Sequence, residues 1–294
     1  MKLTNIEKWA GNVSGIVNQG DNLTILESIP DAPFQIIYID PPFNTGRTQF
    51  MARQSTVNLD TPNIAGQSSE IIRGTLLQYD DQFDNYWGFL EPRLREAWRL
   101  LNNTGTLYLH LDYREVHYAK VMLDAIFGRE CFLNEIIWAY DYGGKSKSRW
   151  PAKHDNILVY VKNPAMYYYN SEEVDREPYM APGLVTPEKA EMGKLPTDVW
   201  WHTIVPTNGR ERTGYPTQKP EGILRRIIQA SSAPGDWVLD FFGGSGTTAY
   251  VANSLGRRFV TIDQNDEAIE IMRTRFSGID KVVFNVDADR SIAV

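Results

Sequence analysis

A regular alternation of apolar runs with amphipathic segments is the feature that most constrains how this chain folds. The alternation is clearest in the last third, where it comprises helix 220–231, strand 236–242, helix 246–255, strand 258–263, helix 265–275 and a strand near Val282. Strands that alternate with helices of about 10 to 15 residues are typical of a parallel sheet covered on both faces. We therefore predict an α/β fold with a doubly wound, mostly parallel, Rossmann-like sheet.

The first half of the chain continues this pattern. The apolar run Phe34–Ile39 is short enough to be a buried strand, and it must end at Asp40 because Pro41 and Pro42 cannot donate ladder hydrogen bonds. The other expected elements are helix 87–101, a turn at 102–105, strand 106–111, helix 116–126, strand 134–140 and strand 156–162.

Two stretches lack a helical or strand period. Residues 45–78 are rich in Ser, Thr, Asn and Gln, and we expect a long loop there with one short helix. Loops of this length in compact domains are usually functional. Residues 163–215 are rich in Pro, Glu and aromatic residues and are predicted to form a small appended lobe.

The composition of the chain excludes several classes of protein. The 294 residues are 42% hydrophobic and 23% charged, as in ordinary globular chains, and no run of 18 apolar residues is available to span a bilayer. Because the N-terminal segment also lacks the apolar run of a signal peptide, we expect a cytoplasmic protein. Cys131 is the single cysteine, which excludes an intrachain disulfide. The net charge of -7 argues against a uniformly basic surface but is compatible with a local basic groove for phosphates.

A glycine-rich segment follows the strand predicted at 236–242. Its residues are Asp240, Phe241, Phe242, Gly243, Gly244, Ser245, Gly246, Thr247 and Thr248. Glycines at a strand-to-helix turn let a ligand approach the backbone beside the positive end of the helix. Asp263 ends the next strand, near the offset at which a carboxylate accepts hydrogen bonds from ribose hydroxyls. The pair predicts a nucleotide or nucleoside site, whereas the loop alone is also explained by a tight turn without a ligand.

The tetrapeptide Asp40-Pro41-Pro42-Phe43 also follows a strand. In a doubly wound sheet its side chains would project into the same crevice as the glycine-rich segment. Asp40 and the Pro41 carbonyl could accept the two hydrogens of an exocyclic amine while Phe43 stacks on the base. In isolation, a strand stop followed by a buried Phe explains the tetrapeptide equally well.

Together these motifs resemble those of the S-adenosylmethionine-dependent amino-methyltransferases of DNA, which carry a D-P-P-[FY] catalytic motif and an F-x-G-x-G cofactor loop. The catalytic motif precedes the cofactor loop here, as in the beta group of that family. Further matches along essentially the whole chain are Gly20-Asp21-Asn22, Asn44-Thr45-Gly46, Asp198-Val199-Trp200 and Tyr215-Pro216-Thr217-Gln218-Lys219-Pro220. The resemblance implies a Rossmann-like methyltransferase sheet.

The resemblance also assigns roles to residues. Asp40, Pro41, Pro42 and Phe43 would hold the target amine. S-adenosylmethionine would be bound, with no metal, by Asp21, Thr217, Gln218, Lys219, Asp240, Phe242, Gly243, Gly244, Ser245, Gly246, Thr247 and Asp263. Among these, Asp263 would meet the ribose, Asp21 the adenine, and Thr217 to Lys219 the methionine end. Outside the family pattern, Asp21 is better explained as a helix N-cap and Lys219 as a solvated residue of a first helical turn.

A basic stretch that also contains glycines and Trp150 has a composition suited to contacting the phosphates along a DNA backbone, with one aromatic contact. Its charged residues are Lys145, Lys147, Arg149, Lys153 and His154. Taken by itself, a charge run of this kind is usually a solvated loop without a partner. Similar proteins place target recognition between the catalytic and cofactor halves, which implies a catalytic half over 1–138 with the loop 45–78, a target-recognition insert over 139–214 and a cofactor half over 215–294.

The activity that the resemblance implies is transfer of a methyl group to the N6 amine of adenine in double-stranded DNA, after the base has been rotated out of the duplex. Members with S-P-P-[YW] commonly methylate N4 of cytosine, and N-P-P-Y is usual for RNA or a protein glutamine. Asp40 and Phe43 therefore favour adenine. N4-cytosine methylation and a catalytically silent DNA-binding relative are the alternatives.

The sequence leaves the wider context open. No nuclease motif is identifiable, so cleavage in a restriction-modification system would need a separate restriction endonuclease. A solitary methyltransferase of a prokaryotic host or a phage is equally compatible with the residues. Similar proteins commonly dimerise, so a homodimer is a further expectation that rests on the resemblance alone.

Overall fold

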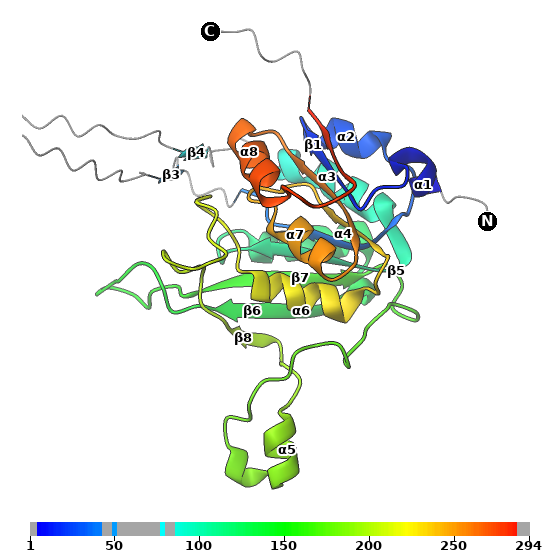
Figure 1. Cartoon of the computed structure of the whole chain (residues 1–294). Coiled ribbons are helices and arrows are strands. Elements are labelled where there is room, and N and C mark those ends of the chain that lie inside the picture. The colour runs from blue at the N-terminus through cyan, green and yellow to red at the C-terminus, as the bar shows by residue number, and fades with distance from the viewer. Residues whose placement is uncertain (1–4, 43–48, 52–76, 80–85, 287–294) are drawn as a thin grey trace, which may run out of the picture.

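The apolar runs of the sequence form the strands of a central sheet. The computed structural model describes residues 5–42, 49–51, 77–79 and 86–286. Within these residues a nine-stranded sheet runs in the order β11 (Val282–Asn285), β1 (Gly15–Gln19), β10 (Arg258–Asp263), β9 (Trp237–Asp240), β2 (Phe34–Ile39), β5 (Leu101–Leu111), β7 (His154–Val161), β6 (Phe132–Ala139) and β8 (Val199–Trp201) (Figure 1).

Most neighbouring strands of the sheet are parallel, which confirms the prediction. Strand β7 departs from this, because it runs antiparallel to both β5 and β6. Its direction follows from its connection: β6 and β7 are joined at one edge of the sheet by a loop without a crossover helix, and such a connection produces antiparallel neighbours.

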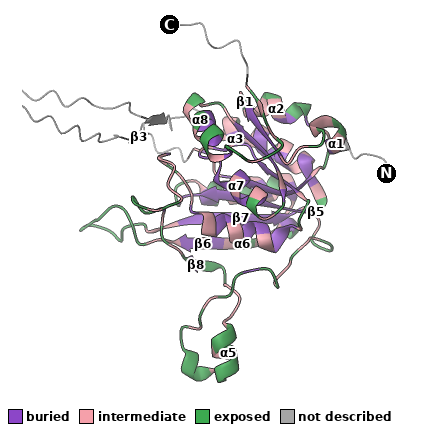
Figure 2. Cartoon of the chain, viewed as in Figure 1, coloured by how far each residue is buried: buried purple, intermediate pink, exposed green. Residues whose placement is uncertain are grey.

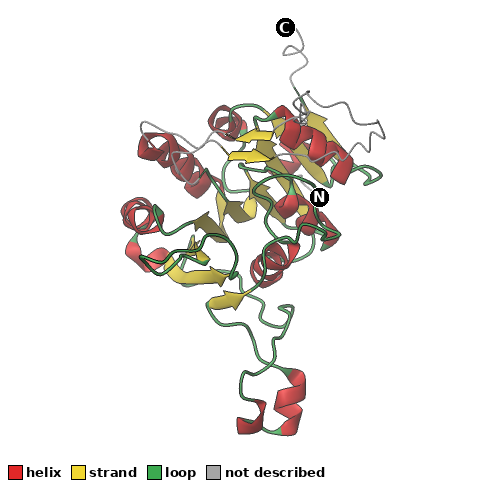
Figure 3. Cartoon of the chain, turned by 90° about the vertical axis from the view of Figure 1, so that its left-hand side faces the viewer, coloured by secondary structure: helices red, strands yellow, loops and turns green. Residues whose placement is uncertain are grey.

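Helices cover both faces of the sheet (Figure 3). One layer contains α1 (Asn5–Ala10), α2 (Asn22–Ser28), α3 (Tyr86–Leu100) and α4 (Val116–Phe127), and the other contains α6 (Glu221–Ser231), α7 (Thr247–Ser254) and α8 (Asp266–Arg275). All six residues of β2 are buried, as expected for a strand covered on both sides (Figure 2). In the described part of the chain, no helix has the length and apolar character needed to cross a membrane.

The remaining elements are short. They are the 3-10 turns η1 (Arg129–Cys131) and η2 (Pro182–Leu184), the helix α5 (Pro187–Met192), and an antiparallel pair formed by β3 (Gln49–Met51) and β4 (Leu77–Tyr79). The pair β3 and β4 falls within the segment predicted as a loop with one short helix. The rest of that segment, 52–76 included, lies outside the described residues.

The turn predicted at 102–105 is wrong, because these residues belong to β5. The register shifts here: Phe34 of β2 pairs with Leu101 and Ile36 pairs with Thr106, so the extra residues of β5 form a bulge. Asn102 stabilises the bulge locally, since its side-chain oxygen accepts a hydrogen bond from the Thr104 N–H at 3.0 Å. The polar composition of the segment reflects this irregular backbone.

The stretch between β6 and α6 contains two segments that leave the sheet at opposite edges, that is, at opposite ends of its strands. The loop 140–153 leaves β6 at the edge where β2 and β5 also end, because Ala139 pairs with His154 and Leu111 with Asn156. The segment 162–198, which we call the arm, leaves from the opposite edge, after β7, and ends at β8, which pairs with the last three residues of β6. Figure 1 shows the arm and its helix α5 projecting beyond β8.

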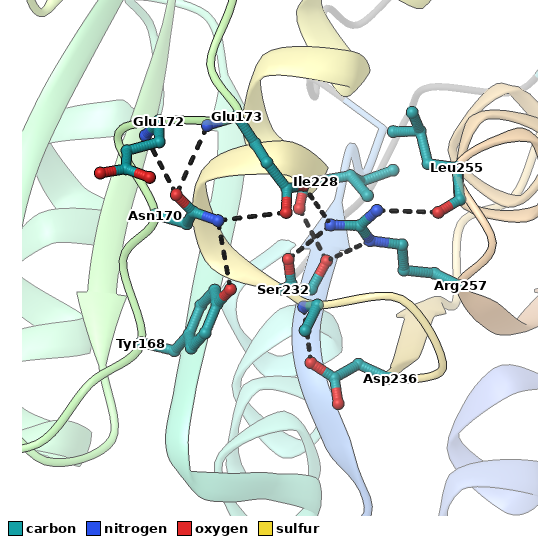
Figure 4. A network of polar contacts seen from close by, with 10 residues as sticks. Tyr168, Asn170, Glu172, Glu173, Ile228, Ser232, Asp236, Leu255 and Arg257 are labelled. Atoms are coloured by element: carbon teal, nitrogen blue, oxygen red, sulfur yellow. Dashed lines mark hydrogen bonds and ion pairs between the residues drawn. The ribbon is translucent and has the colours of Figure 1, made fainter.

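The base of the arm is fastened to the sheet by a buried arginine (Figure 4). Arg257 donates to the carbonyl of Ser232 at 2.6 Å and to the carbonyl of Leu255 at 2.7 Å, and it pairs with Glu173 of the arm at 3.0 Å. Asn170 continues the network, because its side chain donates to Glu173 at 3.1 Å. A guanidinium that is buried but fully engaged in this way stabilises the junction.

We expect Arg257→Met to lower the free energy of unfolding by about 3 kcal/mol, because it leaves buried carbonyl groups without their donor. Urea denaturation followed by circular dichroism measures the change. Arg258→Met is the matched control. This neighbour is about one-third exposed, its ion pair with Glu7 spans 3.6 Å, it donates to the Gly235 carbonyl at 2.9 Å, and its guanidinium lies 4.7 Å from the centre of the Trp237 ring. Its loss should change stability by only about 1 kcal/mol. Equal effects of the two substitutions would contradict the prediction.

Candidate active site

The two motifs meet where the strand order reverses. From β9 the sheet continues to β10 on one side, and from β2 it continues to β5 on the other. Ligands of doubly wound sheets bind outside the carboxyl ends of the strands at such a point. Here a cavity of about 450 Å³ lies between Asp40, which follows β2, and Asp240, which ends β9.

Most of the residues assigned by the sequence line this cavity, namely Asp21, Asp40, Pro42, Thr217, Lys219, Asp240, Phe242, Gly243, Gly244, Ser245, Thr247 and Asp263. Three others, Pro41, Gln218 and Gly246, are not part of its lining. Phe43 lies outside the described residues.

Gln218 is turned away from the cavity. Its side-chain oxygen accepts a hydrogen bond from the Thr213 N–H at 2.8 Å, and its side-chain amide donates to the Glu211 carbonyl at 2.6 Å. These bonds hold the loop that presents Thr217 and Lys219. The geometry therefore gives Gln218 a supporting position rather than a direct contact with a ligand in the cavity.

Two glycines of the glycine-rich loop pack so closely against neighbouring residues that a side chain has no room at either position. A Cβ atom on Gly243 would lie 2.3 Å from the Thr261 hydroxyl of β10, and one on Gly246 would lie 2.7 Å from Met272 of α8. Gly246 also has a φ of +71° as the residue before α7, a conformation that favours glycine. The loop thereby leaves its backbone open toward the cavity at the N-terminal end of α7.

Asp263 fastens the loop from the neighbouring strand. One of its carboxylate oxygens accepts a hydrogen bond from the Gly244 N–H at 2.7 Å, and the other accepts from the Asn265 N–H at 2.9 Å. A carboxylate has about four acceptor positions. Asp263 can therefore hold the loop and still receive hydroxyl donors from a ligand.

Asp240 is buried at the end of β9, with 4% of its surface exposed. Burial, together with the charges of Asp40 and Asp263, raises the pKa of its carboxyl group to about 7, although hydrogen bonds from the Thr248 side chain and the Phe242 N–H oppose the shift. The cavity thus contains a carboxyl group that titrates near neutral pH.

We expect Asp240→Asn to remove part of the pH dependence of stability. Between about pH 4 and pH 7 the folded protein keeps a proton on Asp240 that the unfolded chain has released, so this stabilisation is complete at low pH and is lost as pH rises through about 7. The unfolding free energy of the variant relative to wild type should therefore rise by about 2 kcal/mol between pH 5 and pH 8. Urea denaturation at both pH values measures it, and parallel pH profiles would refute it.

Asp21 has two roles in the structure. It is the N-cap of α2, where its carboxylate accepts the Thr24 N–H at 3.0 Å, as the sequence allowed. It also lines the cavity and pairs with Arg93 at 2.9 Å. Burial raises its pKa, but the hydrogen bonds from Thr24 and the charge of Arg93 outweigh this, and the net pKa is lowered. Half of its side chain stays exposed, so it is available to a ligand.

Asp40 forms an ion pair with Lys219 across the cavity. The side chains are 14% and 12% exposed, respectively. The oxygen of Asp40 that is not bonded to Lys219, Oδ1, is buried and has no hydrogen-bond partner among the described residues. Within the described residues, the site thus presents an acceptor oxygen that lacks a hydrogen-bond donor.

A buried polar chain lies beside this pair. The Tyr38 hydroxyl is 2.7 Å from Nδ1 of His110, whose Nε2 is 3.2 Å from Asp155, and the Tyr140 hydroxyl donates to Asp155 at 3.1 Å. Burial raises the pKa of Asp155, but the hydrogen bond and charge of His110, together with the charge of Lys219, bring the net pKa below its usual value. Tyr38 is the member of this chain that lines the cavity, whereas Tyr140 and Asp155 line a second, smaller cavity.

Among the lining residues to which the sequence assigned no role are Phe89, Arg93 and Tyr215, of which Tyr215 belongs to a matched motif. Arg93 left a detectable signal, because it lies between Leu90 and Leu94 on the buried face of α3, where a charged side chain needs a partner. Its guanidinium bonds to the side chains of Asp21 and Asn22. Phe89 carries no comparable signal in the sequence.

The predicted DNA-binding residues lie on the β6–β7 loop and at the start of β7. Lys145, Lys147 and Arg149 are exposed, Lys153 donates to the Gly143 carbonyl at 3.2 Å, and His154 pairs with Ala139. Lys145, Arg149 and His154 line a second cavity of about 250 Å³ together with Asp112, Tyr113, Tyr140 and Asp155. The structure thus places the basic loop at the sheet edge that carries Asp40.

Comparison with known proteins agrees with this architecture. The structure resembles the crystal structure of the M1.HpyAVI-SAM complex with a TM-score of 0.58 at 19% sequence identity, over 89% of this chain and 98% of that one. At this level of identity the likeness establishes the fold, which confirms the predicted Rossmann-like methyltransferase sheet.

Sequence comparison finds relatives of higher identity and a matching family model. The chain is 30% identical over 262 residues to the type II methyltransferase M.HpaI of Haemophilus parainfluenzae, covering 87% of this chain and 74% of that protein. It is 29% identical over 269 residues to the DNA adenine methyltransferase YhdJ of Escherichia coli strain K12, covering 89% and 82%. The family model described as DNA methylase, for N6 and N4 methyltransferases, matches residues 34–274, and this chain therefore belongs to the DNA amino-methyltransferase family.

Proposed function

We propose that this protein transfers a methyl group from S-adenosylmethionine to the N6 amine of adenine in DNA. The observation that carries the proposal is Oδ1 of Asp40, which is buried, has no hydrogen-bond partner among the residues that the structure describes, and belongs to a residue that lines the same cavity as the glycine-rich loop. A buried acceptor without a partner is uncommon in proteins. An exocyclic amine brought into the cavity would supply the missing donor.

The cavity fits the cofactor in size and in its polar groups. Its volume of about 450 Å³ lies within the usual range of cofactor sites. Asp263 would accept hydrogen bonds from the ribose, Asp21 would face the adenine, and the open backbone at Gly243 and Gly244 would lie along the cofactor. S-adenosylmethionine supplies an electrophilic methyl group on a sulfonium when bound.

The residues of the chain would act on the amine. The lone pair of an aromatic amine is delocalised into the ring, which makes the nitrogen a weak nucleophile. Asp40 would accept one of its hydrogens, favour a more pyramidal nitrogen and stabilise the positive charge that develops on it during attack. The Pro41 carbonyl is the second acceptor in this proposal. Because Asp40 is recessed in a cavity, the base must leave the duplex to reach it.

The DNA is proposed to lie along the sheet edge that carries Asp40. The loop 140–153 presents Lys145, Lys147 and Arg149 at this edge, where they would contact phosphates. The insert proposed over 139–214 also contains β7, which is part of the central sheet, and the arm, which leaves from the opposite edge. We therefore propose that target recognition resides mainly in 140–153 and 202–214.

Adenine is preferred over cytosine on two grounds. A carboxylate at position 40 is the form that the resemblance associates with adenine. YhdJ, to which this chain is 29% identical, is named a DNA adenine methyltransferase. A homodimer, a cognate restriction endonuclease and a cytoplasmic location in a bacterial or phage-infected cell remain proposals that rest on the family.

Transfer of labelled methyl from S-adenosylmethionine to unmodified genomic DNA, followed by nucleoside analysis, tests the proposal. The expected product is N6-methyladenine, and sequencing of the modified positions would then give the recognition sequence. Label in N4-methylcytosine would overturn the choice of base. Cofactor binding without any label in DNA would move the substrate to RNA or protein, or identify a catalytically silent relative.

A further inference from the structure

Lys219 reaches the catalytic end of the cavity from the cofactor half of the chain. It lies in the segment just before α6, and its ammonium group contacts Oδ2 of Asp40. Both side chains are largely buried, with 12% and 14% of their surface exposed for Lys219 and Asp40. At such a location an ion pair is far less screened than on the surface, so each group restricts the position of the other.

The environment explains why a cation is needed at this point. The carboxyl groups of Asp155 and Asp240 act electrostatically on the same region: Lys219 interacts with Asp155, and Asp40 interacts with Asp240. Like charges gathered in a buried site repel one another and favour the protonated forms. Lys219 is the ammonium group among the residues that line this cavity, and it offsets that repulsion.

The two oxygens of Asp40 therefore have different surroundings. Oδ2 is held by Lys219, whereas Oδ1 is buried and has no hydrogen-bond partner in the described part of the chain. Fixing one oxygen of a carboxylate also fixes the direction of the other. The geometry leaves Oδ1 with an open acceptor position and Oδ2 with a charged donor.

We propose that Lys219 is a positioning residue for Asp40, which holds Oδ2 of the carboxylate and thereby directs Oδ1 toward the target amine. This inference rests on the proposed function. It assigns Lys219 to the amine end of the cavity, whereas the sequence resemblance implied a place at the methionine end of the cofactor. The two assignments differ in what Lys219 should affect: turnover in the first case and cofactor affinity in the second.

The test compares Lys219→Met and Lys219→Arg with wild type in the full-length protein. Isothermal titration calorimetry gives the Kd of S-adenosylmethionine, and steady-state methylation of DNA gives kcat at saturating cofactor. We expect Lys219→Met to lower kcat by at least about 100-fold while the Kd changes by less than about threefold. Lys219→Arg should recover kcat to within about tenfold of wild type, because a guanidinium can still pair with Asp40. Lys8→Met, on exposed α1, is the control and should match wild type.

Three outcomes would overturn the proposal. A Kd raised more than about tenfold with kcat unchanged would assign Lys219 to the cofactor. If the Met variant fails to bind cofactor, Lys219→Gln is assayed in the same way. Loss of binding in both variants would assign Lys219 to the cofactor where circular dichroism shows a folded protein, and to the fold where it does not. If wild type binds S-adenosylmethionine but methylates no DNA, the proposed function itself fails, and the role of Lys219 fails with it.

Discussion

Replacing Asp40 by Ala should abolish methyl transfer, lowering kcat by at least about 1,000-fold, while the Kd of S-adenosylmethionine changes by less than about threefold. The substitution removes the buried acceptor that faces the amine but leaves the glycine-rich loop and Asp263 in place. Radiolabel incorporation into DNA measures the rate, and calorimetry measures the affinity for the cofactor.

Two further variants make this result specific. Asp40→Asn keeps the size of the side chain but removes its charge, so it should also be severely impaired if the negative charge of the carboxylate is essential. Asp31→Ala, whose side chain is 81% exposed after α2, should behave as wild type. Turnover of Asp40→Ala at the wild-type rate would refute the assignment of Asp40 and, with it, the proposed mechanism.

Gly243→Ala should weaken binding of S-adenosylmethionine by at least about 50-fold, a loss of about 2.3 kcal/mol of binding free energy. A Cβ atom at this position would lie 2.3 Å from the Thr261 hydroxyl, a distance that forces the loop away from β10. The shift would displace Gly244, whose N–H bonds to Asp263, and so disturb two of the groups proposed to meet the cofactor. Calorimetric titration measures the affinity directly.

Gly183→Ala is the matched control for the loop. This glycine lies in η2 on the exposed arm, and a Cβ atom there would have nothing within 4 Å. Its substitution should leave cofactor affinity unchanged. If Gly243→Ala binds the cofactor as tightly as Gly183→Ala does, the cofactor does not depend on the close packing of this loop.

Much of the fold could be predicted because each element carries its own signal. Strands β2 and β10 have the predicted bounds, since β2 is a continuous apolar run that proline soon follows, and β10 has a buried centre between Gly256 and the polar residues 264–266. Helices α3, α4 and α6 lie within a residue of their predicted positions for the same local reason. The bulge at 102–105 was mistaken for a turn, because polar residues accompany irregular backbone of either kind.

The residues of the site also fall into two groups, those that the sequence could indicate and those that it could not. Asp40, Asp240, Gly243 and Asp263 could be selected from the sequence because each follows a strand whose end lies at the binding edge of the sheet. Arg93 and Tyr215 could not be selected with equal ease, because their relevance depends on residues distant in the chain: Arg93 bonds to Asp21, and Tyr215 packs beside Gly244.

The sequence by itself determined the α/β class, the two motifs and their common edge, because strand periodicity and the residues after each strand are local properties of the chain. Only the tertiary structure decided how the side chains at that edge are paired. Lys219 is 179 residues from Asp40, and no local pattern predicts that the two form an ion pair. That pairing, and the open oxygen it leaves on Asp40, arise because folding brings separate strand ends into a poorly solvated cavity, where every charge requires a partner.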